Sequence, residues 1–341
     1  MELSLHGFET RMSEPFHDLP WPDTPEGEPR RIGVEIEMAG VSLEIMAEAV
    51  KAEFGGQIEP DNAFVARVRD TDVGDFQLEL DARVLKDRAY REHLARLGIE
   101  LDDSDKAALD RWLADAAGRL VPHEIVAPPI PVADLPRLDR VRAALQEAGA
   151  QGTERSFLYA FGLQINIEIH RTDAEWLLAI LRSFLLMAEA LTAAGAIDLA
   201  RRLSPYIRAF PGPFVRHMLD PDFQPDQAGL IDAYLAHSPT RNRPLDLLPL
   251  FAHLDPERVN AAPVEHDLIK PRPAFHYRLP NCEIDDPDWS LARPFNGWVE
   301  VERLAADPER LERLSREYLD RPGQALGRWA DDWSQRLRDW F

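Results

Sequence analysis

The sequence contains one cysteine, Cys282, among 341 residues. A single thiol cannot form an intrachain disulfide, and it also excludes a zinc site built from several cysteines. Disulfides are common in proteins of oxidising compartments and rare in those of reducing compartments. We therefore expect a cytoplasmic protein.

Long apolar runs are absent as well. Residues 1–30 are rich in proline and acidic residues, and they contain no apolar segment of the kind that a signal peptide needs. The most apolar stretch, 176–194, is interrupted by Arg182 and Glu189. It falls short of the ~18 uninterrupted apolar residues that span a bilayer. We expect no association with a membrane.

Positive charge is scarce. The chain has 39 Lys and Arg residues against 60 Asp and Glu residues, which gives a net charge of −21. A chain this acidic repels nucleic acid and anionic membranes unless it concentrates its basic residues in one place, and no basic run is present. We expect no nucleic-acid partner, and the sequence leaves the oligomeric state open.

The order of the expected elements indicates an α+β fold. Alternating patterns predict strands at 31–38, 64–69, 74–81, 123–127, 162–170 and 274–279. Helical spacing predicts helices at 42–54, 104–120, 134–148, 176–194 and from 299 onward, and short helices between loops at 204–255. Because strands and helices do not alternate regularly, we expect a mainly antiparallel sheet with helices on its apolar face. We divide the chain into an extended arm (1–30), a catalytic domain (31–300) and a C-terminal helical segment packed on it (301–341).

Every predicted strand has one apolar face and one polar face, because side chains alternate along a strand. The polar positions are Glu35, Glu37, Asp75, Gln77, Glu79, Asp81, Glu124, Gln164, Asn166, Glu168, His170, His276 and Arg278. Carboxylates on neighbouring strands repel each other, and acids are poor strand formers. A divalent cation with a preference for oxygen ligands, Mg²⁺ or Mn²⁺, accounts for this face. A face exposed to solvent, without metal, is the alternative.

Four segments resemble, in order, those of the amidoligase family of carboxylate–amine ligases, within the glutamine synthetase and glutamate–cysteine ligase superfamily. The first is Gly33-Val34-Glu35-Ile36-Glu37, which looks like a G-x-E-x-E strand. The others are the acidic strand 75–81, the stretch 123–129 (HEIVAPP), and the late strand 276–281 (HYRLPN). The segment 161–166 (FGLQIN) stands where the family has G-x-H-x-H. The resemblance covers roughly residues 31 to 300.

The resemblance implies a glutamine synthetase-like catalytic fold with a curved sheet. It also implies an ATP-dependent enzyme that joins a small-molecule carboxylate to an amine through an acyl phosphate, with Mg²⁺ or Mn²⁺ bound on the acidic face. The implied metal ligands are Glu35, Glu79 and Glu124 for one ion, and Glu37 and Asn166 for another.

Arginines are the implied contacts to phosphate, because the planar guanidinium pairs with two phosphate oxygens at once. Arg278 and Arg208 are predicted to act on the transferring group, and Arg241, Arg243 and Gln164 to bind ATP. We interpret His170 and His276 as structural residues of the sheet.

The chain departs from the family pattern at the metal face. Gln164 and Asn166 replace both histidines of G-x-H-x-H, and Ala127 replaces the usual serine. Two other functions therefore stay open: a metal-dependent hydrolase that uses the same carboxylates, and a catalytically inactive binding protein of the same fold. The sequence does not identify the acid or the amine.

Overall fold

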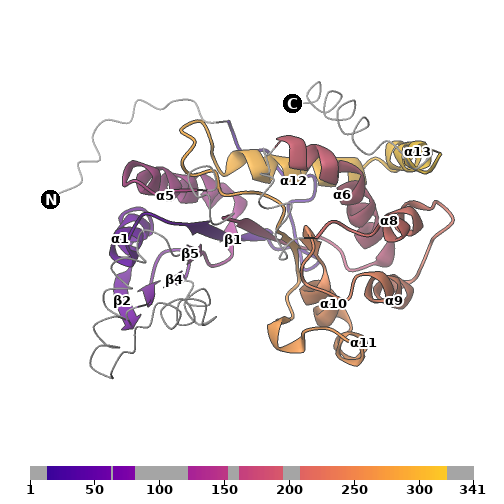
Figure 1. Ribbon diagram of the computed structural model, residues 1–341, viewed down its shortest axis with the longest axis horizontal. Helices are drawn as coiled ribbons and strands as arrows, with labels where there is room; N and C mark the ends of the chain where they lie inside the picture. Colours follow the sequence, from indigo (N-terminus) through magenta and orange to yellow (C-terminus); the bar gives the residue numbers. More distant parts are fainter. Residues whose placement is uncertain (1–13, 63, 81–121, 153–160, 195–207, 321–341) are drawn as a thin grey trace, which may run out of the picture.

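The computed structural model describes residues 14–62, 64–80, 122–152, 161–194 and 208–320 (Figure 1). In this part of the chain nine strands form one sheet, in the order β2-β3-β4-β5-β1-β7-β9-β8, with β6 also paired to β1. The strands are β1 (Arg31–Met38), β2 (Gln57–Asn62), β3 (Val65–Arg69), β4 (Phe76–Leu80), β5 (His123–Val126), β6 (Ile130–Pro131), β7 (Leu163–Glu168), β8 (Leu245–Asp246) and β9 (Ala274–Tyr277). All the paired strands run antiparallel. The predicted α+β class with an antiparallel sheet is confirmed.

Helices account for most of the rest of the described chain. They are α1 (Leu43–Phe54), α5 (Leu135–Glu147), α6 (Ala174–Ala194), α8 (Gly212–Leu219), α9 (Gln227–His237), α10 (Leu248–Leu254), α11 (Pro256–Ala261), α12 (Ala292–Ala305) and α13 (Pro308–Leu319). Short 3-10 turns lie at Val132–Asp134 and His266–Leu268. None of these helices combines the length and the apolarity that crossing a membrane requires.

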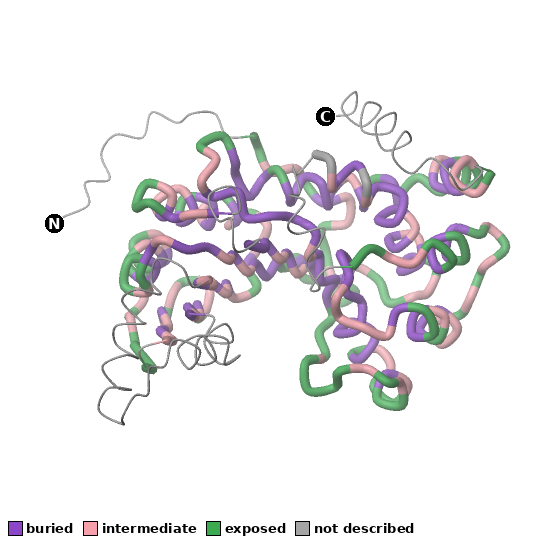
Figure 2. The backbone as a smooth tube through the Cα atoms, in the orientation of Figure 1, coloured by how far each residue is buried: buried purple, intermediate pink, exposed green. Residues whose placement is uncertain are grey.

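The apolar face of the sheet is built from rows of directly opposed residues. One row runs through Leu78, Ile125, Ile36 and Leu163 on β4, β5, β1 and β7, and all four are buried. Residues opposed on antiparallel strands project to the same side, so each row is a continuous apolar strip. The tube in Figure 2 accordingly shows buried residues along the sheet and exposed residues on the outer loops and helix surfaces.

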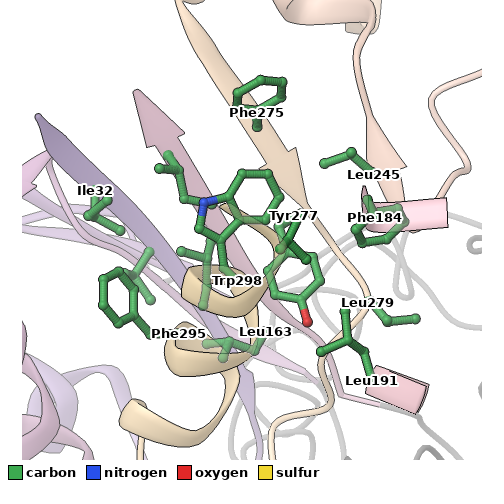
Figure 3. Packing of buried hydrophobic residues seen from close by; sticks show 14 of the residues in the cluster. Ile32, Leu163, Phe184, Leu191, Leu245, Phe275, Tyr277, Leu279, Phe295 and Trp298 are labelled. Atoms are coloured by element: carbon green, nitrogen blue, oxygen red, sulfur yellow. The ribbon is translucent and has the colours of Figure 1, made fainter. Parts of the chain in front are cut away.

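Helix α12 covers the end of this apolar face near β9. Its Trp298 is fully buried, with ring centroids 5.4 Å from Phe275 and 5.6 Å from Tyr277 (Figure 3). Aromatic pairs at this spacing pack in tilted orientations and stabilise beyond their buried area. The ring of Phe184 on α6 reaches the other side of Tyr277, with centroids 5.9 Å apart. The two helices therefore fix the position of β9.

A buried ion pair connects the beginning of β1 to α12. Arg30 donates from Nη2 to Oε1 of Glu302 at 2.7 Å and from Nη1 to Oε2 at 3.0 Å, and both side chains are inaccessible to solvent. The indole N–H of Trp298 donates to Glu302 Oε1 at 2.7 Å. The boundary we predicted at residue 300 lies inside α12, so the helix continues across it without interruption.

Most of the predicted elements are present, with small changes at their ends. Helix α1 begins where expected, because Oγ of Ser42 accepts the N–H of Ile45 at 3.3 Å and caps the helix. The strand predicted at 274–279 ends at Tyr277, so Arg278 follows it. Strands β2, β6 and β8 were not predicted. The helix predicted at 104–120, residues 1–13 of the arm and the tail after 320 lie outside the described residues.

Candidate active site on the polar face of the sheet

Three glutamates stand in one row across the middle of the sheet. Glu37 on β1 is the register partner of Glu124 on β5, and Glu124 is the partner of Glu79 on β4. All three are half-buried. We call Glu37, Glu124 and Glu79 the glutamate row. The family resemblance implied Glu35 together with Glu79 and Glu124 as ligands of one ion, but the register puts Glu37 in line with Glu79 and Glu124.

Glu35 lies two residues before Glu37 on β1 and projects to the same face of the sheet. The side-chain amides of Gln164 and Asn166 hold its carboxylate. Gln164 Nε2 donates to Glu35 Oε1 at 3.0 Å, and Asn166 Nδ2 donates to the same oxygen at 2.8 Å. Gln164 Nε2 also donates to Asn166 Oδ1 at 2.8 Å. Gln164 and Asn166, which we call the amide cluster, stand where the family pattern has its two histidines, and Glu35 is the first glutamate of the G-x-E-x-E strand.

Burial raises the pKa of Glu35, although the hydrogen bond from Asn166 and the positive charge of Arg278 act in the opposite direction. The neighbouring charge of Glu37 raises it further, and that of Arg241 lowers it. The strand of Glu35, β1, lies between β4 and β5, which carry Glu79 and Glu124, and β7 and β9, the second of which is followed by Arg278. Glu35 therefore stands between the acidic and the basic parts of the face.

Arg241 and Arg278 form the basic part. Arg241 donates from Nε to Asp246 Oδ2 at 3.0 Å, and Arg278 Nη1 lies 3.9 Å from the same oxygen. Arg278 Nη1 also donates to the backbone oxygen of Arg241 at 2.9 Å. The two predicted arginines are thus brought together, and a buried carboxylate that we did not predict joins them.

Arg243 and Arg208 have a different setting. Arg243 is buried and donates from Nη1 to the backbone oxygens of Ala209 at 2.7 Å and Arg208 at 3.3 Å. Its guanidinium also lies 5.5 Å from the ring centroid of Phe210. Arg208 is exposed, and its backbone N–H donates to the backbone oxygen of Asn242 at 2.9 Å. These contacts give Arg243 a role in holding the segment 208–210 against the loop before β8.

Gly33 makes room for the amide cluster. It is the register partner of Asn166, and a Cβ atom at Gly33 would lie 3.3 Å from Asn166 Cβ and 3.5 Å from Nδ2. A larger residue would push Asn166 away from Glu35. The first glycine of the G-x-E-x-E pattern therefore has a local steric reason in this chain.

The donor chemistry of this face fits a divalent cation. Carboxylate and amide oxygens are the ligands that Mg²⁺ and Mn²⁺ prefer, and opposed residues on neighbouring strands have Cβ atoms only ~5 Å apart. As placed, no three His, Cys, Asp or Glu side chains in the described ranges converge closely enough to hold a metal ion. Metal binding stays a prediction, and it requires side chains of the glutamate row to turn toward a shared ion.

Asp246 was not predicted from the sequence, and Gln77 was placed on this face but not assigned to the site. Gln77 donates from Nε2 to Glu79 Oε1. Asp246 is completely buried in the two-residue strand β8. The available signal for Asp246 was an acid inside an apolar run, Leu245-Asp246-Leu247-Leu248, because an acid in such a run is rarely buried without a partner.

The comparison with protein families agrees with the resemblance. Residues 28–300 match the family model described as "Putative amidoligase enzyme". The match covers most of the chain, and the chain belongs to this family. The protein is therefore an enzyme of the ligase type. No curated protein and no solved structure matches the chain.

Proposed function

We propose that this amidoligase joins the carboxylate of one small molecule to the amine of another, in a reaction that depends on ATP and on Mg²⁺ or Mn²⁺. The observation that carries the proposal is the glutamate row, with Arg241 and Arg278 on the opposite side of Glu35. An acidic metal face beside a pair of arginines is the arrangement that phosphoryl transfer needs, because charge must be neutralised on both donor and acceptor oxygens.

Each part of the face has a role on this proposal. Glu37, Glu79 and Glu124 hold the metal ions, with Glu35 and Asn166 at the edge of the same site. When bound, Mg²⁺-ATP supplies the phosphoryl group that converts the substrate carboxylate to an acyl phosphate, from which the amine displaces phosphate. Arg241 and Arg278 neutralise the oxygens that gain charge. The amide cluster fixes the carboxylate of Glu35 through two donors to one oxygen.

The proposal also includes the type of fold and the cellular location. The antiparallel sheet with glutamates on one face supports an architecture related to glutamine synthetase. The single buried cysteine supports a location in the cytoplasm.

A thermal-shift screen tests the function. The full chain is melted with Mg²⁺-ATP and a panel of amino acids and polyamines, and pairs that add to the stabilisation are assayed for release of ADP and phosphate. Turnover that requires ATP, an acid and an amine together supports the proposal. The Glu124→Gln variant should lose turnover, whereas Glu48→Gln, an exposed residue in the middle of α1, should keep it.

Two results would replace the proposal. Stabilisation by Mg²⁺ with none by ATP, together with ATP-independent bond cleavage, would favour the metal-dependent hydrolase. An unchanged melting temperature in every condition would favour a binding protein without catalytic activity.

A further inference from the structure

Asp246 is a buried acid at one end of the polar face. Its side chain has no exposure to solvent, and Oδ1 accepts the backbone N–H of Leu248 at 3.1 Å. Oδ2 accepts from Arg241 Nε at 3.0 Å and lies 3.9 Å from Arg278 Nη1. Burial raises the pKa of Asp246, while the charges of Arg241 and Arg278 oppose that shift. A carboxylate is costly to bury, so this one is kept where two guanidinium groups compensate it.

The two arginines are anchored on one side and accessible on the other. Arg241 donates from Nη1 to the backbone oxygen of Leu268, and Arg278 donates to the backbone oxygen of Arg241 at 2.9 Å. Their side chains are 22% and 25% exposed, in contrast to Asp246 at 0%. The contacts therefore fix the orientation of both guanidinium groups while part of each still reaches solvent.

A neighbouring histidine adds a polar atom without a partner. His276 stands in a row with Asn166 and Asp246, and it is buried. Its Nδ1 makes no hydrogen bond to any described residue. Burial and the charges of Arg241 and Arg278 lower the pKa of His276 to about 3, so the ring is neutral and leaves the charge of the arginine pair unchanged. Buried polar atoms are normally paired, so an unpaired one beside two arginines indicates a place that a ligand completes.

We propose that Asp246 is a positioning residue that holds Arg241 and Arg278 as an oxyanion-binding pair, which takes a phosphate or carboxylate group of the reactants. The proposal deepens the proposed function and rests on it for the identity of the ligand. Arg241 and Arg278 each reach solvent in part, so both guanidinium groups can meet an anion there. Fixed guanidinium donors favour such groups because little side-chain freedom is lost when the anion binds.

The Asp246→Asn variant distinguishes a positioning role of Asp246 from a purely electrostatic role. Removing a negative charge beside two arginines makes the site more positive, so a purely electrostatic role predicts tighter binding of an anion. A positioning role predicts the opposite, because Arg241 loses the charged acceptor that orients it. We expect the dissociation constant for inorganic phosphate, or for acetate, to rise roughly tenfold or more, as the loss of a charge-assisted contact implies. Each constant is obtained from the dependence of the melting temperature of the full chain on anion concentration.

Two further variants complete the test. Asp232→Asn makes the same change of net charge at an exposed carboxylate paired with Arg258, and it should leave both anion affinities unchanged. Arg241→Lys keeps the positive charge but removes the Nε–H that contacts Asp246, and it should weaken anion binding as Asp246→Asn does. If Asp246→Asn does not fold, Arg241→Lys still tests the anion-binding pair, and an affinity equal to that of wild type would overturn the proposal.

The outcomes are distinct from those of the function test. Loss of the phosphate response alone assigns the pair to a phosphoryl group, and loss of the acetate response alone assigns it to the substrate carboxylate. Wild-type protein that responds to neither anion, or variants whose affinities equal or exceed the wild-type value, would overturn the positioning role even if Mg²⁺-ATP binds. Anion binding that depends on Asp246 in a protein that ignores Mg²⁺-ATP would keep the site and remove the ligase mechanism.

Discussion

Glu37 on β1 and Glu124 on β5 are directly opposed residues of adjacent antiparallel strands, so two carboxylates stand side by side on one face of the sheet. Glu79 extends the row to β4, and the next residue in register, on β3, is Val65. Like charges opposed across a sheet destabilise the pair. A fold that keeps three of them in line carries a cost that a bound cation relieves, and this relationship is the basis of the metal site we propose.

The close approach of Gly33 to Asn166 predicts a sensitive position. Gly33→Ala places a Cβ atom 3.3 Å from Asn166 Cβ, which forces the amide to move and weakens its bond to Glu35. Overpacking of this kind costs about 1–3 kcal/mol of the free energy of unfolding, and turnover should fall as well. Gly212→Ala is the matched control, since nothing lies within 4 Å of a Cβ there. Urea unfolding of both variants checks the prediction; equal stabilities would contradict it.

The buried pair of Arg30 and Glu302 predicts a strong dependence of the fold on α12. Arg30→Met leaves the carboxylate of Glu302 buried without its cation, which should cost about 3–5 kcal/mol. The double variant Arg30→Met/Glu302→Leu should recover part of this loss, because no lone charge remains. Arg316→Ala breaks an exposed pair, 61% and 55% accessible, and should change stability by less than about 1 kcal/mol.

Chemical denaturation measures these free energies. If Arg30→Met is as stable as Arg316→Ala, the contact between the start of β1 and α12 does not contribute to the fold as described.

The single thiol predicts a simple probe of unfolding. Cys282 is buried, and burial raises its pKa to about 12. The reactive thiolate is therefore scarce in the folded protein at pH 8, and the sulfur is also inaccessible. Labelling by an aromatic disulfide reagent should be slow in native buffer and fast in urea, where the thiol regains its usual pKa of about 8.5. Comparable labelling rates in the two solutions would show that the thiol is exposed in the native state.

Period-two alternation predicted the faces of β1, β5 and β7 because each has one continuous apolar side, as in Ile32, Val34 and Ile36. The same signal failed for β2, whose residues Gln57–Asn62 are mostly exposed and include a proline. Such a sequence becomes a strand at the sheet edge only because β3 is beside it, a long-range effect that no local pattern contains.

The glutamates of the candidate site could be found by the same alternation, since their positions follow from the strands that carry them. Alternation could not show which arginines reach the polar face. Arg241 and Arg243 lie two residues apart in one loop, yet one contacts Asp246 on the polar face and the other holds the segment 208–210. Only the packing of that loop against β8 and β9 distinguishes them.

The most direct test of the account is the effect of Mg²⁺-ATP on the melting of wild-type protein and of Glu37→Gln. Glutamine keeps the shape of the side chain and can still accept the N–H of Gly162, which Glu37 Oε2 accepts at 2.6 Å. It removes one charge from the glutamate row. In EDTA we expect Glu37→Gln to be at least as stable as wild type, because the repulsion is smaller. In Mg²⁺-ATP at ~100 times its dissociation constant, wild type should gain about 2.7 kcal/mol.

The variant should gain clearly less, and Glu48→Gln, at an exposed position of α1, should behave as wild type. ATP in EDTA should stabilise none of the three proteins. The account predicts that the Mg²⁺-ATP shift depends on Glu37. It is contradicted if Mg²⁺-ATP leaves the wild-type melting temperature unchanged, or if it shifts wild type and Glu37→Gln equally.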